Sequence, residues 1–307
     1  MQPADECFKK VKNEYLNFLS KEKILNKSKT EKIAILKKIY IPLSFWIEKK
    51  YRQKGKILFL GISGGQGTGK TTATSIIKII LKIFFKREIC ITSIDDFYKT
   101  AEDRTKMSKK IHPLFKTRGV PGTHEINLLK KFFHQTKKKK FEKFRLPKFD
   151  KSTDNRFKKK HWTLVNRKPQ IVILEGWCIG AKPQPNKLIK KSINILEKNE
   201  DKKLIWRKHV NNMLKNEYKK IFSIIDHYIF MKIPNFNMVF KWRLLQESKL
   251  KKKSHFKKKI MSYNEIKRFI MFYERITLQM IKDLSKSASV IMLLNKNHVI
   301  KKALFKN

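Results

Sequence analysis

Glycines, a lysine and threonines gather in one short stretch of the chain, GGQGTGKTT, between Gly64 and Thr72. Its first eight residues match the pattern G-x-x-x-x-G-K-[ST]. Such glycines let the backbone turn tightly round an anion, so that its N–H groups point at phosphate oxygens. The Lys70 amine is expected to reach the β- and γ-phosphates, and the Thr71 hydroxyl to ligate Mg²⁺. The stretch predicts a nucleoside triphosphate site whose contacts are Gly64, Gly65, Gln66, Gly67, Thr68, Gly69, Lys70, Thr71 and Thr72.

The elements on either side of this loop distinguish a phosphate site from a chance match. Residues 57–60 are a short apolar run that predicts a buried strand. Residues 72–85 are rich in isoleucine and phenylalanine and contain no glycine or proline, which predicts a helix. A glycine-rich turn that matches the pattern by chance would not be expected to lie between a strand and a helix. Strand, glycine loop and helix in succession therefore favour a phosphate-binding loop (P-loop).

Two further predicted strands end at carboxylates. Residues 88–94 run directly into Asp95 and Asp96, and residues 171–177 carry Glu175. Open α/β sheets bind their ligands at the carboxyl ends of their strands, so these acids are expected beside the P-loop. An acid placed like Glu175 holds Mg²⁺ directly or through water in P-loop enzymes. The predicted metal ligands are therefore Thr71 and Glu175.

The rest of the chain alternates between helical and strand patterns. Strands are predicted at 227–233 and 288–294, and helices at 125–133, 186–198, 203–222, 239–247 and 263–284. This alternation is typical of an α/β fold with a doubly wound, mainly parallel sheet and helices on both faces.

Two more helices, 6–19 and 29–50, precede the first strand, and Pro42 is a candidate breaker of the second. No Ser/Gly-rich linker separates these helices from the first strand. We expect residues 1–50 to be a helical extension packed on a P-loop domain of residues 51–307.

Composition sets limits on the class of protein. A chain of 307 residues with 41% hydrophobic residues can bury a sizeable core. No apolar run approaches the length of about eighteen residues that a membrane-spanning helix needs, and the first residues are acidic rather than basic. The cysteines, Cys7, Cys90 and Cys178, are widely separated and lack metal-ligand spacing. We expect a cytoplasmic protein with no membrane partner, no disulfide framework and no zinc site.

The formal charge of +49 invites a nucleic-acid interpretation. Of the 74 basic residues, however, 63 are lysine and only eleven are arginine, whose planar fork suits phosphate and base recognition. The lysines are scattered in short runs at 137–140, 158–160, 251–253 and 257–259. A solvated surface is favoured over a nucleic-acid partner, although a nucleic-acid-bound P-loop NTPase stays an alternative. Where this chain keeps an arginine, we expect that lysine does not suffice.

Several candidate side chains lie between residues 99 and 156, and the first part of this region, residues 99–122, is polar. The sequence Arg118-Gly-Val-Pro-Gly-Thr-His124 contains two glycines and a proline, which fix an unusual backbone path. Thr123 is a candidate N-cap for the helix predicted from Glu125. Residues 99–122 are expected to be turn-rich, and residues 146–156 an extended surface loop.

Taken together, five segments resemble the D-glycerate 3-kinase family of P-loop kinases, a group related to uridine kinase, phosphoribulokinase and bacterial pantothenate kinase. The segments are GGQGTGKT at the P-loop, Ser93–Tyr98, Arg118–His124, Phe149–Ser152 and Glu175–Trp177. The block from Arg118 to His124 is the most specific, and the segment after Ser152 is shorter than the family pattern. The resemblance implies transfer of the γ-phosphoryl group of ATP, with Mg²⁺, to a hydroxyl of D-glycerate. A uridine- or pantothenate-kinase-like activity is the alternative within the superfamily.

The resemblance also implies roles for individual residues. Asp95 would accept the hydroxyl proton, with a Mg²⁺ role as its alternative and Asp96 in reserve. Lys70 would stabilise the transition state, and Arg243 resembles a lid arginine that closes over the phosphates, with a surface helix arginine as its alternative. The acceptor's carboxylate would be bound by Arg118, His124, Lys151 and Arg156. Oligomeric state is not predicted.

Overall fold

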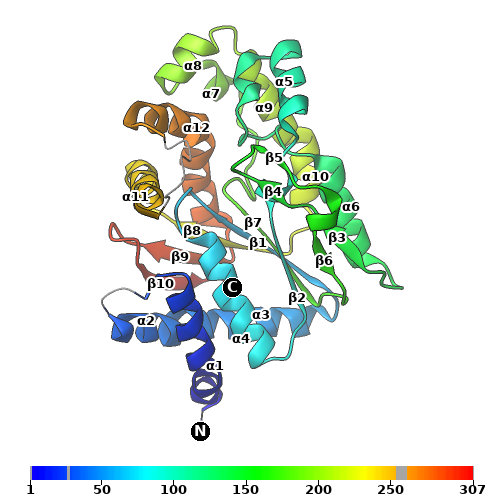
Figure 1. Ribbon diagram of the computed structural model, residues 1–307, viewed down its shortest axis with the longest axis vertical. Coiled ribbons are helices and arrows are strands. Elements are labelled where there is room, and N and C mark those ends of the chain that lie inside the picture. Colours follow the sequence, from blue (N-terminus) through cyan, green and yellow to red (C-terminus); the bar gives the residue numbers. More distant parts are fainter. Residues whose placement is uncertain (1, 26–27, 254–260, 307) are drawn as a thin grey trace.

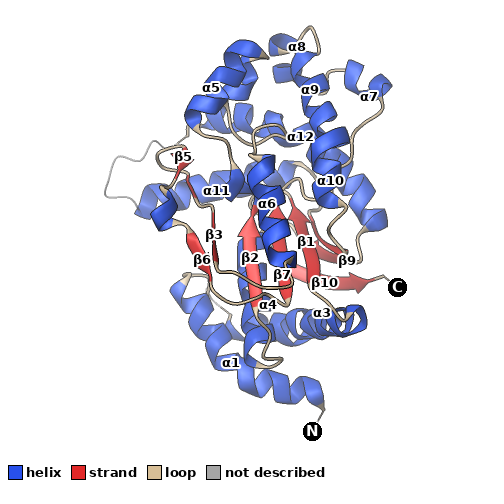
Figure 2. Cartoon of the chain, turned by 90° about the vertical axis from the view of Figure 1, so that its right-hand side faces the viewer, coloured by secondary structure: helices blue, strands red, loops and turns tan. Residues whose placement is uncertain are grey.

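The computed structural model describes residues 2–25, 28–253 and 261–306 (Figures 1 and 2). Side chains are described for the same residues except 249–253. The lysine run at 257–259 therefore lies outside the described residues. For the run at 251–253, the backbone is described and the side chains are not.

A six-stranded sheet forms the centre of the molecule, in the strand order β10-β9-β8-β1-β7-β2. Neighbouring strands pair in parallel, except that β10 is antiparallel to β9 at one edge. Five of the six strands were predicted from apolar runs, and β10 was not. The strands are β1 (Leu58–Gly64), β2 (Ile89–Ser93), β7 (Ile171–Gly176), β8 (His227–Lys232), β9 (Val290–Leu294) and β10 (Ile300–Phe305).

Alternate residues of the central strands point into two separate cores. On β1, Leu58, Leu60 and Ile62 belong to one hydrophobic cluster, whereas Phe59 belongs to the other. The first cluster is completed by helices on one face, α1 (Pro3–Lys21), α3 (Ile41–Lys54) and α4 (Lys70–Ile83). The second is completed by α6 (Ile126–Lys137), α9 (Ile205–Met213) and α10 (Lys219–Phe222), and α12 (Tyr263–Ser287) contributes to both. The predicted doubly wound α/β fold is confirmed.

The N-terminal helices pack on the sheet's helical layer, where α1 and α3 contact α4 (Figure 1). Pro42 does not end the second helical segment. Helix α2 (Lys29–Ile35) passes through a π-helical turn, Leu36–Tyr40, into α3, and Pro42 lies in the first turn of α3. The wider turn comes just before the proline, where the missing N–H interrupts the hydrogen-bond ladder of the continuous helical segment. Helix α3 runs across residue 50, and the division of the chain into an extension and a domain stays a prediction.

The region after β2 is more regular than the sequence indicated. Helix α5 (Ala101–Lys110) lies within the segment predicted to be turn-rich, and it begins with a capping box between Thr100 and Asp103. Thr123 is not the N-cap of α6. Its buried hydroxyl instead accepts from the Gly119 N–H (3.0 Å) and donates to the Val120 carbonyl oxygen (2.7 Å), so it holds the preceding turn.

The segment predicted as an extended loop forms two small antiparallel ribbons. Strand β3 (Phe144–Leu146) pairs with β6 (Thr163–Val165), and β4 (Phe149–Asp150) pairs with β5 (Asn155–Arg156). The remaining helices are α7 (Asn186–Lys190), α8 (Ile195–Glu200) and α11 (Asn237–Lys253). The predicted helix 186–198 is thus divided between α7 and α8, and the predicted helix 203–222 continues from α9 to α10 through a π-helical turn, Leu214–Tyr218.

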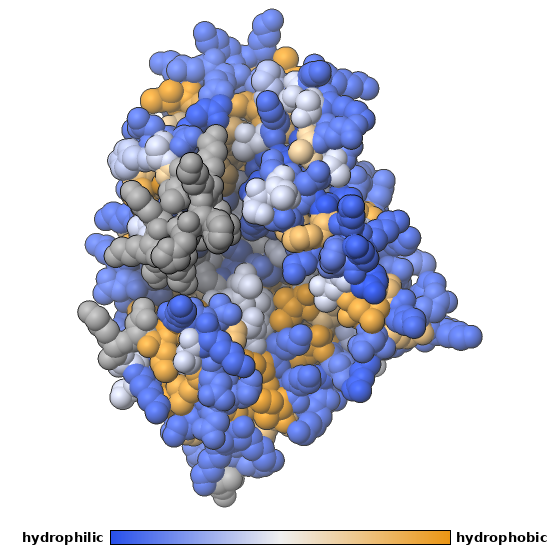
Figure 3. Space-filling view, in the orientation of Figure 1, coloured by the Kyte–Doolittle hydropathy of each residue, from blue (hydrophilic) through white to orange (hydrophobic). Residues whose placement is uncertain are grey.

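Hydrophilic side chains cover most of the face seen in Figure 3. The lysine runs 137–140 and 158–160 lie in exposed positions, apart from the half-buried Lys138, and all three cysteines are buried and free. Within the described ranges, no helix has the length and apolar character needed to cross a membrane.

Candidate active site

The P-loop connects β1 to α4, and its glycines are required by its shape. Gly67 and Gly69 have φ angles of +77° and +85°, left-handed backbone that glycine adopts without strain. A Cβ added to Gly64 would lie 2.9 Å from the Cβ of Met231, closer than real atoms approach. The loop ends at the N-terminus of α4, a helix of 14 residues whose free N–H groups favour an anion.

Lys70 folds back on the loop. Its Nζ donates to the carbonyl oxygens of Gly64 (2.9 Å) and Gly65 (3.1 Å). Burial lowers the pKa of Lys70, and the nearby carboxylates of Glu175 and Asp95 oppose that shift. A phosphate would offer this ammonium a stronger, charged partner than two neutral carbonyls.

The other P-loop side chains close the loop or face it. The Thr68 hydroxyl donates to the Gly65 carbonyl oxygen (2.9 Å), and Thr72 is half-buried in the first turn of α4. The Oε1 atom of Gln66 is buried and has no hydrogen-bond partner. A buried acceptor left in this way costs free energy, which a ligand that brings an N–H or O–H donor to the loop would recover. The predicted nucleotide contacts are thus together in one loop that fits a phosphate chain.

Thr71 and Glu175 meet across the gap between α4 and β7. The Thr71 hydroxyl donates to Glu175 Oε1 over 3.0 Å. Burial raises the pKa of Glu175, which is 6% exposed, and the neighbouring Lys70 lowers it. Hydroxyl and carboxylate oxygens are the donors that Mg²⁺ takes. No group of three or more His, Cys, Asp and Glu side chains in the described part of the chain could hold a metal.

Asp95 lies just after β2, at the same edge of the sheet as Glu175. Its Oδ2 accepts from Lys151 Nζ (2.7 Å), and its Oδ1 accepts from the Tyr98 hydroxyl (2.9 Å). Burial alone would raise the pKa of Asp95, but Lys151 and the Tyr98 hydroxyl outweigh it and the pKa lies below its usual value. Asp95 is therefore ionised at neutral pH.

Asp96 has a different environment although it is the next residue. Its Oδ1 accepts from the backbone N–H of Phe149 (3.2 Å), which ties β4 to the end of β2. Burial raises the pKa of Asp96 to about 6. The side chain thus positions the ribbon that carries Lys151.

His124 is completely buried beside Asp95's partners. Its ring stacks on that of Tyr98, with centroids 4.6 Å apart and planes 19° apart, and its Nδ1 shares a hydrogen bond of 2.6 Å with the Tyr218 hydroxyl. Its Nε2 is buried without a partner. Burial lowers the pKa of His124 to about 4, so the ring is neutral at pH 7. His124 can offer a hydrogen bond to an acceptor but not a positive charge.

Arg118 begins a turn that only glycine can complete. Gly119 has a φ of +140°, and a Cβ there would lie 2.2 Å from the Tyr273 hydroxyl. That hydroxyl donates to the Arg118 carbonyl oxygen (3.2 Å). The guanidinium pairs through Nη1 with Asp154 and lies over the Phe149 ring, 5.6 Å from its centroid. Backbone and side chain of Arg118 are both held.

Lys151 and Arg156 complete the group predicted to bind the acceptor. Lys151 is exposed except for its bond to Asp95, and its carbonyl oxygen is 3.5 Å from Arg118 Nη2. Arg156 donates from Nη2 to the Tyr98 carbonyl oxygen (2.9 Å), while its Nε is buried without a partner. Burial lowers the pKa of Arg156. The structure thus brings together Asp95, Arg118, His124, Lys151 and Arg156, directly or through Tyr98.

Arg243, the predicted lid arginine, lies on α11. It pairs with Glu247 one turn later, and its guanidinium lies 5.3 Å from the centroid of the Phe269 ring. Its Nε is buried without a partner. The adjacent Trp242 lies against the P-loop, where its Cβ would be 3.1 Å from a Cβ on Gly67. The helix that carries Arg243 therefore touches the loop, while Arg243 itself is engaged in its own ion pair.

Known proteins resemble the chain over most of its length. No protein-family model matches it. "Uncharacterized kinase mug58" of Schizosaccharomyces pombe is 32% identical over 237 residues, which make up 74% of this chain and 82% of that protein. "D-glycerate 3-kinase, chloroplastic" of Arabidopsis thaliana is 29% identical over 225 residues, 68% of this chain but only 47% of the plant protein.

The solved structure of a D-glycerate 3-kinase from Cryptococcus neoformans superimposes with a TM-score of 0.73, at 21% identity, over 87% of this chain and 99% of that one. At that identity the likeness shows the fold. The chain belongs to the D-glycerate 3-kinase family. It is a P-loop kinase and a phosphotransferase. The plant relative is chloroplastic by name, and the cytoplasmic location of this kinase stays a prediction.

Three residues of this kinase's site were not singled out in the sequence. Arg104 binds Asp154, the partner of Arg118. Tyr218 holds His124, and Tyr273 holds the Arg118 backbone. The scarcity of arginine in the chain is a signal that could have found Arg104. The two tyrosines reach the site from α12 and from the π-helical turn before α10, and nothing local in their sequence marks them.

Proposed function

We propose that this kinase transfers the γ-phosphoryl group of ATP to a hydroxyl of D-glycerate and produces 3-phosphoglycerate. The observation that carries the proposal is the contact of Lys151 with the ionised Asp95, at the edge of the sheet where the P-loop lies. Arg118 is next to Lys151, with its Nη2 3.5 Å from the Lys151 carbonyl oxygen. A small hydroxy acid has one carboxylate for the cations and one hydroxyl for Asp95. The plant and fungal proteins named D-glycerate 3-kinase support the same acceptor.

In the proposed reaction the acceptor's hydroxyl oxygen forms a bond to the γ-phosphorus, and the bond from that phosphorus to the β,γ-bridging oxygen breaks. The hydroxyl proton passes to Asp95, and ADP leaves. Catalysis of this kind depends on positioning and on neutralising charge. Lys70 would leave the loop carbonyls for the phosphates, where negative charge develops.

Mg²⁺ fits the oxygen atoms of Thr71 and Glu175, which would hold it beside the phosphates. There the ion supplies positive charge against the transferring phosphoryl group.

Lys151 has a second role in the proposed reaction, because its ammonium group donates a hydrogen bond to Asp95 in this structure. A bound carboxylate would compete for the Lys151 ammonium, as a charged partner of equal sign to Asp95. Once Lys151 turns toward the carboxylate of the bound acceptor, the pKa of Asp95 rises toward its usual value. Asp95 then becomes a better proton acceptor. Acceptor binding and activation of Asp95 are thereby linked.

The test is ADP release in a coupled assay with D-glycerate, uridine, pantothenate and ribulose 5-phosphate, each at saturating ATP and Mg²⁺. Turnover with glycerate and identification of 3-phosphoglycerate by ³¹P NMR is the expected result, and Lys70→Ala should abolish it while the protein stays folded. Turnover with another acceptor alone would overturn the glycerate assignment. ATP hydrolysis stimulated by RNA or DNA, with no small-molecule acceptor used, would favour the nucleic-acid-bound NTPase instead.

A further inference from the structure

Arg104 is the largest fully buried residue in the described part of the protein, with 1% of its surface exposed. A buried guanidinium is costly unless its donors are satisfied. Here Nε donates to the Lys99 carbonyl oxygen (3.3 Å), Nη1 to that of Lys116 (2.7 Å) and Nη2 to that of Asp154 (3.0 Å). One side chain of α5 thus joins three segments that surround the acceptor-binding group.

Asp154 connects the hydrogen bonds of Arg104 to the acceptor-binding group. Its backbone is in the left-handed region, with a φ of +55°, which is uncommon for a residue with a side chain. Arg104 Nη2 also bonds its Oδ2 (2.7 Å), while its Oδ1 pairs with Arg118 Nη1. The carboxylate therefore lies between a buried arginine, whose side chain is 2% exposed, and one that is 28% exposed.

Arg118 is consequently held on two sides. Asp154 binds one end of its guanidinium, and the Phe149 ring covers one face. Two planar constraints of this kind leave a guanidinium a single orientation, and a group fixed in advance loses less entropy when it binds a carboxylate. The weak contact of Nη2 with the Lys151 carbonyl oxygen, at 3.5 Å, leaves that edge available.

We propose that Arg104 and Asp154 are positioning residues for the acceptor: Arg104 fixes Asp154, and Asp154 fixes the fork of Arg118 toward the acceptor's carboxylate. The inference rests on the proposed function, since it requires an acceptor that carries a carboxylate. It predicts that changes at Arg104 or Asp154 weaken the binding of the acceptor and leave that of ATP unchanged. If the two residues had only a structural role, their replacement would lower the stability of the protein or change the KM for glycerate and the KM for ATP alike.

The principal variant is Asp154→Asn, which keeps the size of a partly exposed side chain and removes its charge. We expect the KM for glycerate to rise up to about tenfold, because a freed Arg118 side chain must then be ordered when the acceptor binds, with kcat and the KM for ATP within about twofold. Arg104→Lys should act in the same direction and also lower Tm, because a single ammonium cannot reach all three segments. Arg145→Lys is the matched control, since Arg145 also bonds two backbone carbonyl oxygens but does so at the exposed β3–β6 ribbon. It should change neither KM.

A double variant separates positioning from structure. If Asp154 acts through the fork of Arg118, then Asp154→Asn should change the KM for glycerate less than about twofold when Arg118 is already Lys. A full tenfold effect in the Arg118→Lys background, or an unchanged KM in Asp154→Asn alone, would overturn the inference. Asp154→Asn decides the question even where Arg104→Lys does not fold.

Failure of the proposed function gives a different pattern. Wild-type turnover with another hydroxy acid in place of glycerate overturns the proposed acceptor, and the same variants then test the positioning with that acid. Wild-type turnover only with acceptors that lack a carboxylate overturns both. Turnover with glycerate and no effect of the variants overturns the inference alone.

Discussion

Two adjacent aspartates follow β2, and their surroundings give them different properties. Asp95 bonds Lys151 and Tyr98, which keep its pKa below the usual value, whereas Asp96 accepts one backbone N–H and its burial raises its pKa to about 6. Titratable neighbours pushed apart in this way indicate separate roles. Sequence alone could name both residues, but only the fold distinguishes the one facing Lys151 from the one tying β4.

Asp95→Asn is expected to lower kcat by about 10²-fold or more, with little change in the KM for ATP, because an amide cannot accept the hydroxyl proton. Steady-state kinetics with each substrate varied in turn provides the measurement. Asp96→Asn is the neighbouring control and should keep kcat within a few-fold. A fall in the affinity for Mg²⁺·ATP at preserved kcat would instead make Asp95 a metal ligand.

Asp96 should make the folded protein less stable as the pH rises from about 4 to about 6. Its pKa in the folded protein, about 6, lies above the usual 3.8, so in this window the native state keeps a proton that the unfolded chain has released. Its contribution to stability is therefore complete below pH 4 and lost as the pH passes 6. A shift of this size corresponds to about 3 kcal/mol.

Urea unfolding of the wild type and of Asp96→Asn at pH 4 and at pH 7 measures this effect, since the other carboxyl groups contribute equally to both proteins. We expect the wild type to lose stability relative to the variant between the two pH values. A difference that stays constant with pH would show that Asp96 titrates normally.

At the scale of elements, apolar periodicity predicted the strands that build the site but not helix α5. Only one of its ten residues, Arg104, is buried, so the helix has no apolar face for a pattern to reveal. The capping box at Thr100 and Asp103 was its one local signal. For the same reason apolar periodicity could not point to Arg104, which only the scarcity of arginine marks in the sequence.

The ribbon β4–β5 shows a second limit of sequence-based prediction. Each strand has only two residues, and the Phe149 N–H bonds a carboxylate more than fifty residues earlier in the chain. Such an element is fixed by tertiary contacts rather than by its own propensity. Lys151 and Arg156 were predicted to bind the acceptor from the family resemblance. Their contacts with Asp95 and Tyr98 could not be predicted from the spacing of residues in the sequence.

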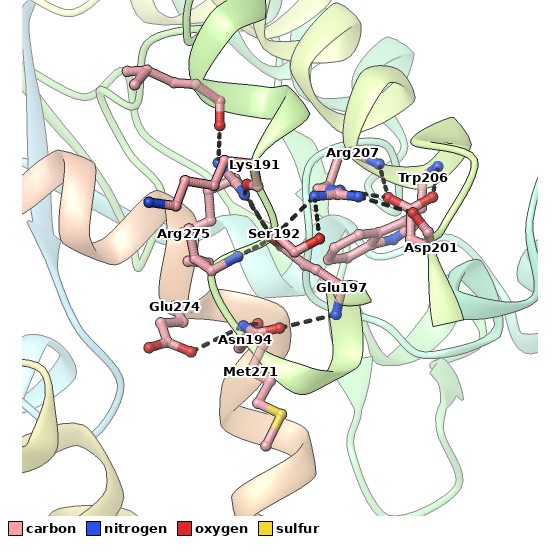
Figure 4. Close-up of polar contacts among 12 residues, drawn as sticks. Lys191, Ser192, Asn194, Glu197, Asp201, Trp206, Arg207, Met271, Glu274 and Arg275 are labelled. Carbon is pink, nitrogen blue, oxygen red and sulfur yellow. Dashed lines mark hydrogen bonds and ion pairs between the residues drawn. The ribbon is translucent and has the colours of Figure 1, made fainter. Parts of the chain in front are cut away.

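Helix α12 is anchored by a buried network of charges (Figure 4). Glu197 on α8 binds Arg275 of α12 through both oxygens, at 2.7 and 2.6 Å, and lies 3.4 Å from Arg207 of α9. Arg207 also bonds Asp201 (2.8 Å). The same helix presents Tyr273 to the Arg118 backbone. The network therefore fixes a helix that supports the site.

Glu197→Gln should destabilise the protein by about 3–5 kcal/mol, because it leaves two arginine side chains without their shared buried anion. The free energy of unfolding and Tm provide the measurement. Glu200→Gln is the control on the same helix, since Glu200 pairs with Arg268 at the surface and its loss should cost less than about 1 kcal/mol. Equal effects of the two variants would contradict the importance assigned to burial.

The charge of +49 acts on the whole molecule. Apart from the half-buried Lys138, the described lysine runs are exposed, whereas Arg104, Arg207 and Arg275 each bind several acceptors inside the fold. These three arginines join segments through their forks, whereas others, such as Arg52 and Arg167, lie exposed like the lysine runs. A large excess of one charge repels itself and lowers the stability of the compact state. That repulsion is screened by salt, because the Debye length falls from about 30 Å at 0.01 M to about 3 Å at 1 M.

Replacement of Lys158, Lys159 and Lys160 by glutamine should therefore stabilise the protein at low salt. The three side chains are exposed, and their removal takes three like charges from the surface without emptying the core. We expect a gain on the order of 1 kcal/mol in the free energy of unfolding at 0.01 M NaCl, which disappears near 1 M. Urea unfolding at both salt concentrations measures it, and phosphoryl transfer should stay unchanged. Urea is the suitable denaturant because guanidinium chloride would itself screen the charges. A variant equally or less stable than the wild type at low salt would mean that these lysines make favourable contacts, and the self-repulsion account of the surface would be wrong.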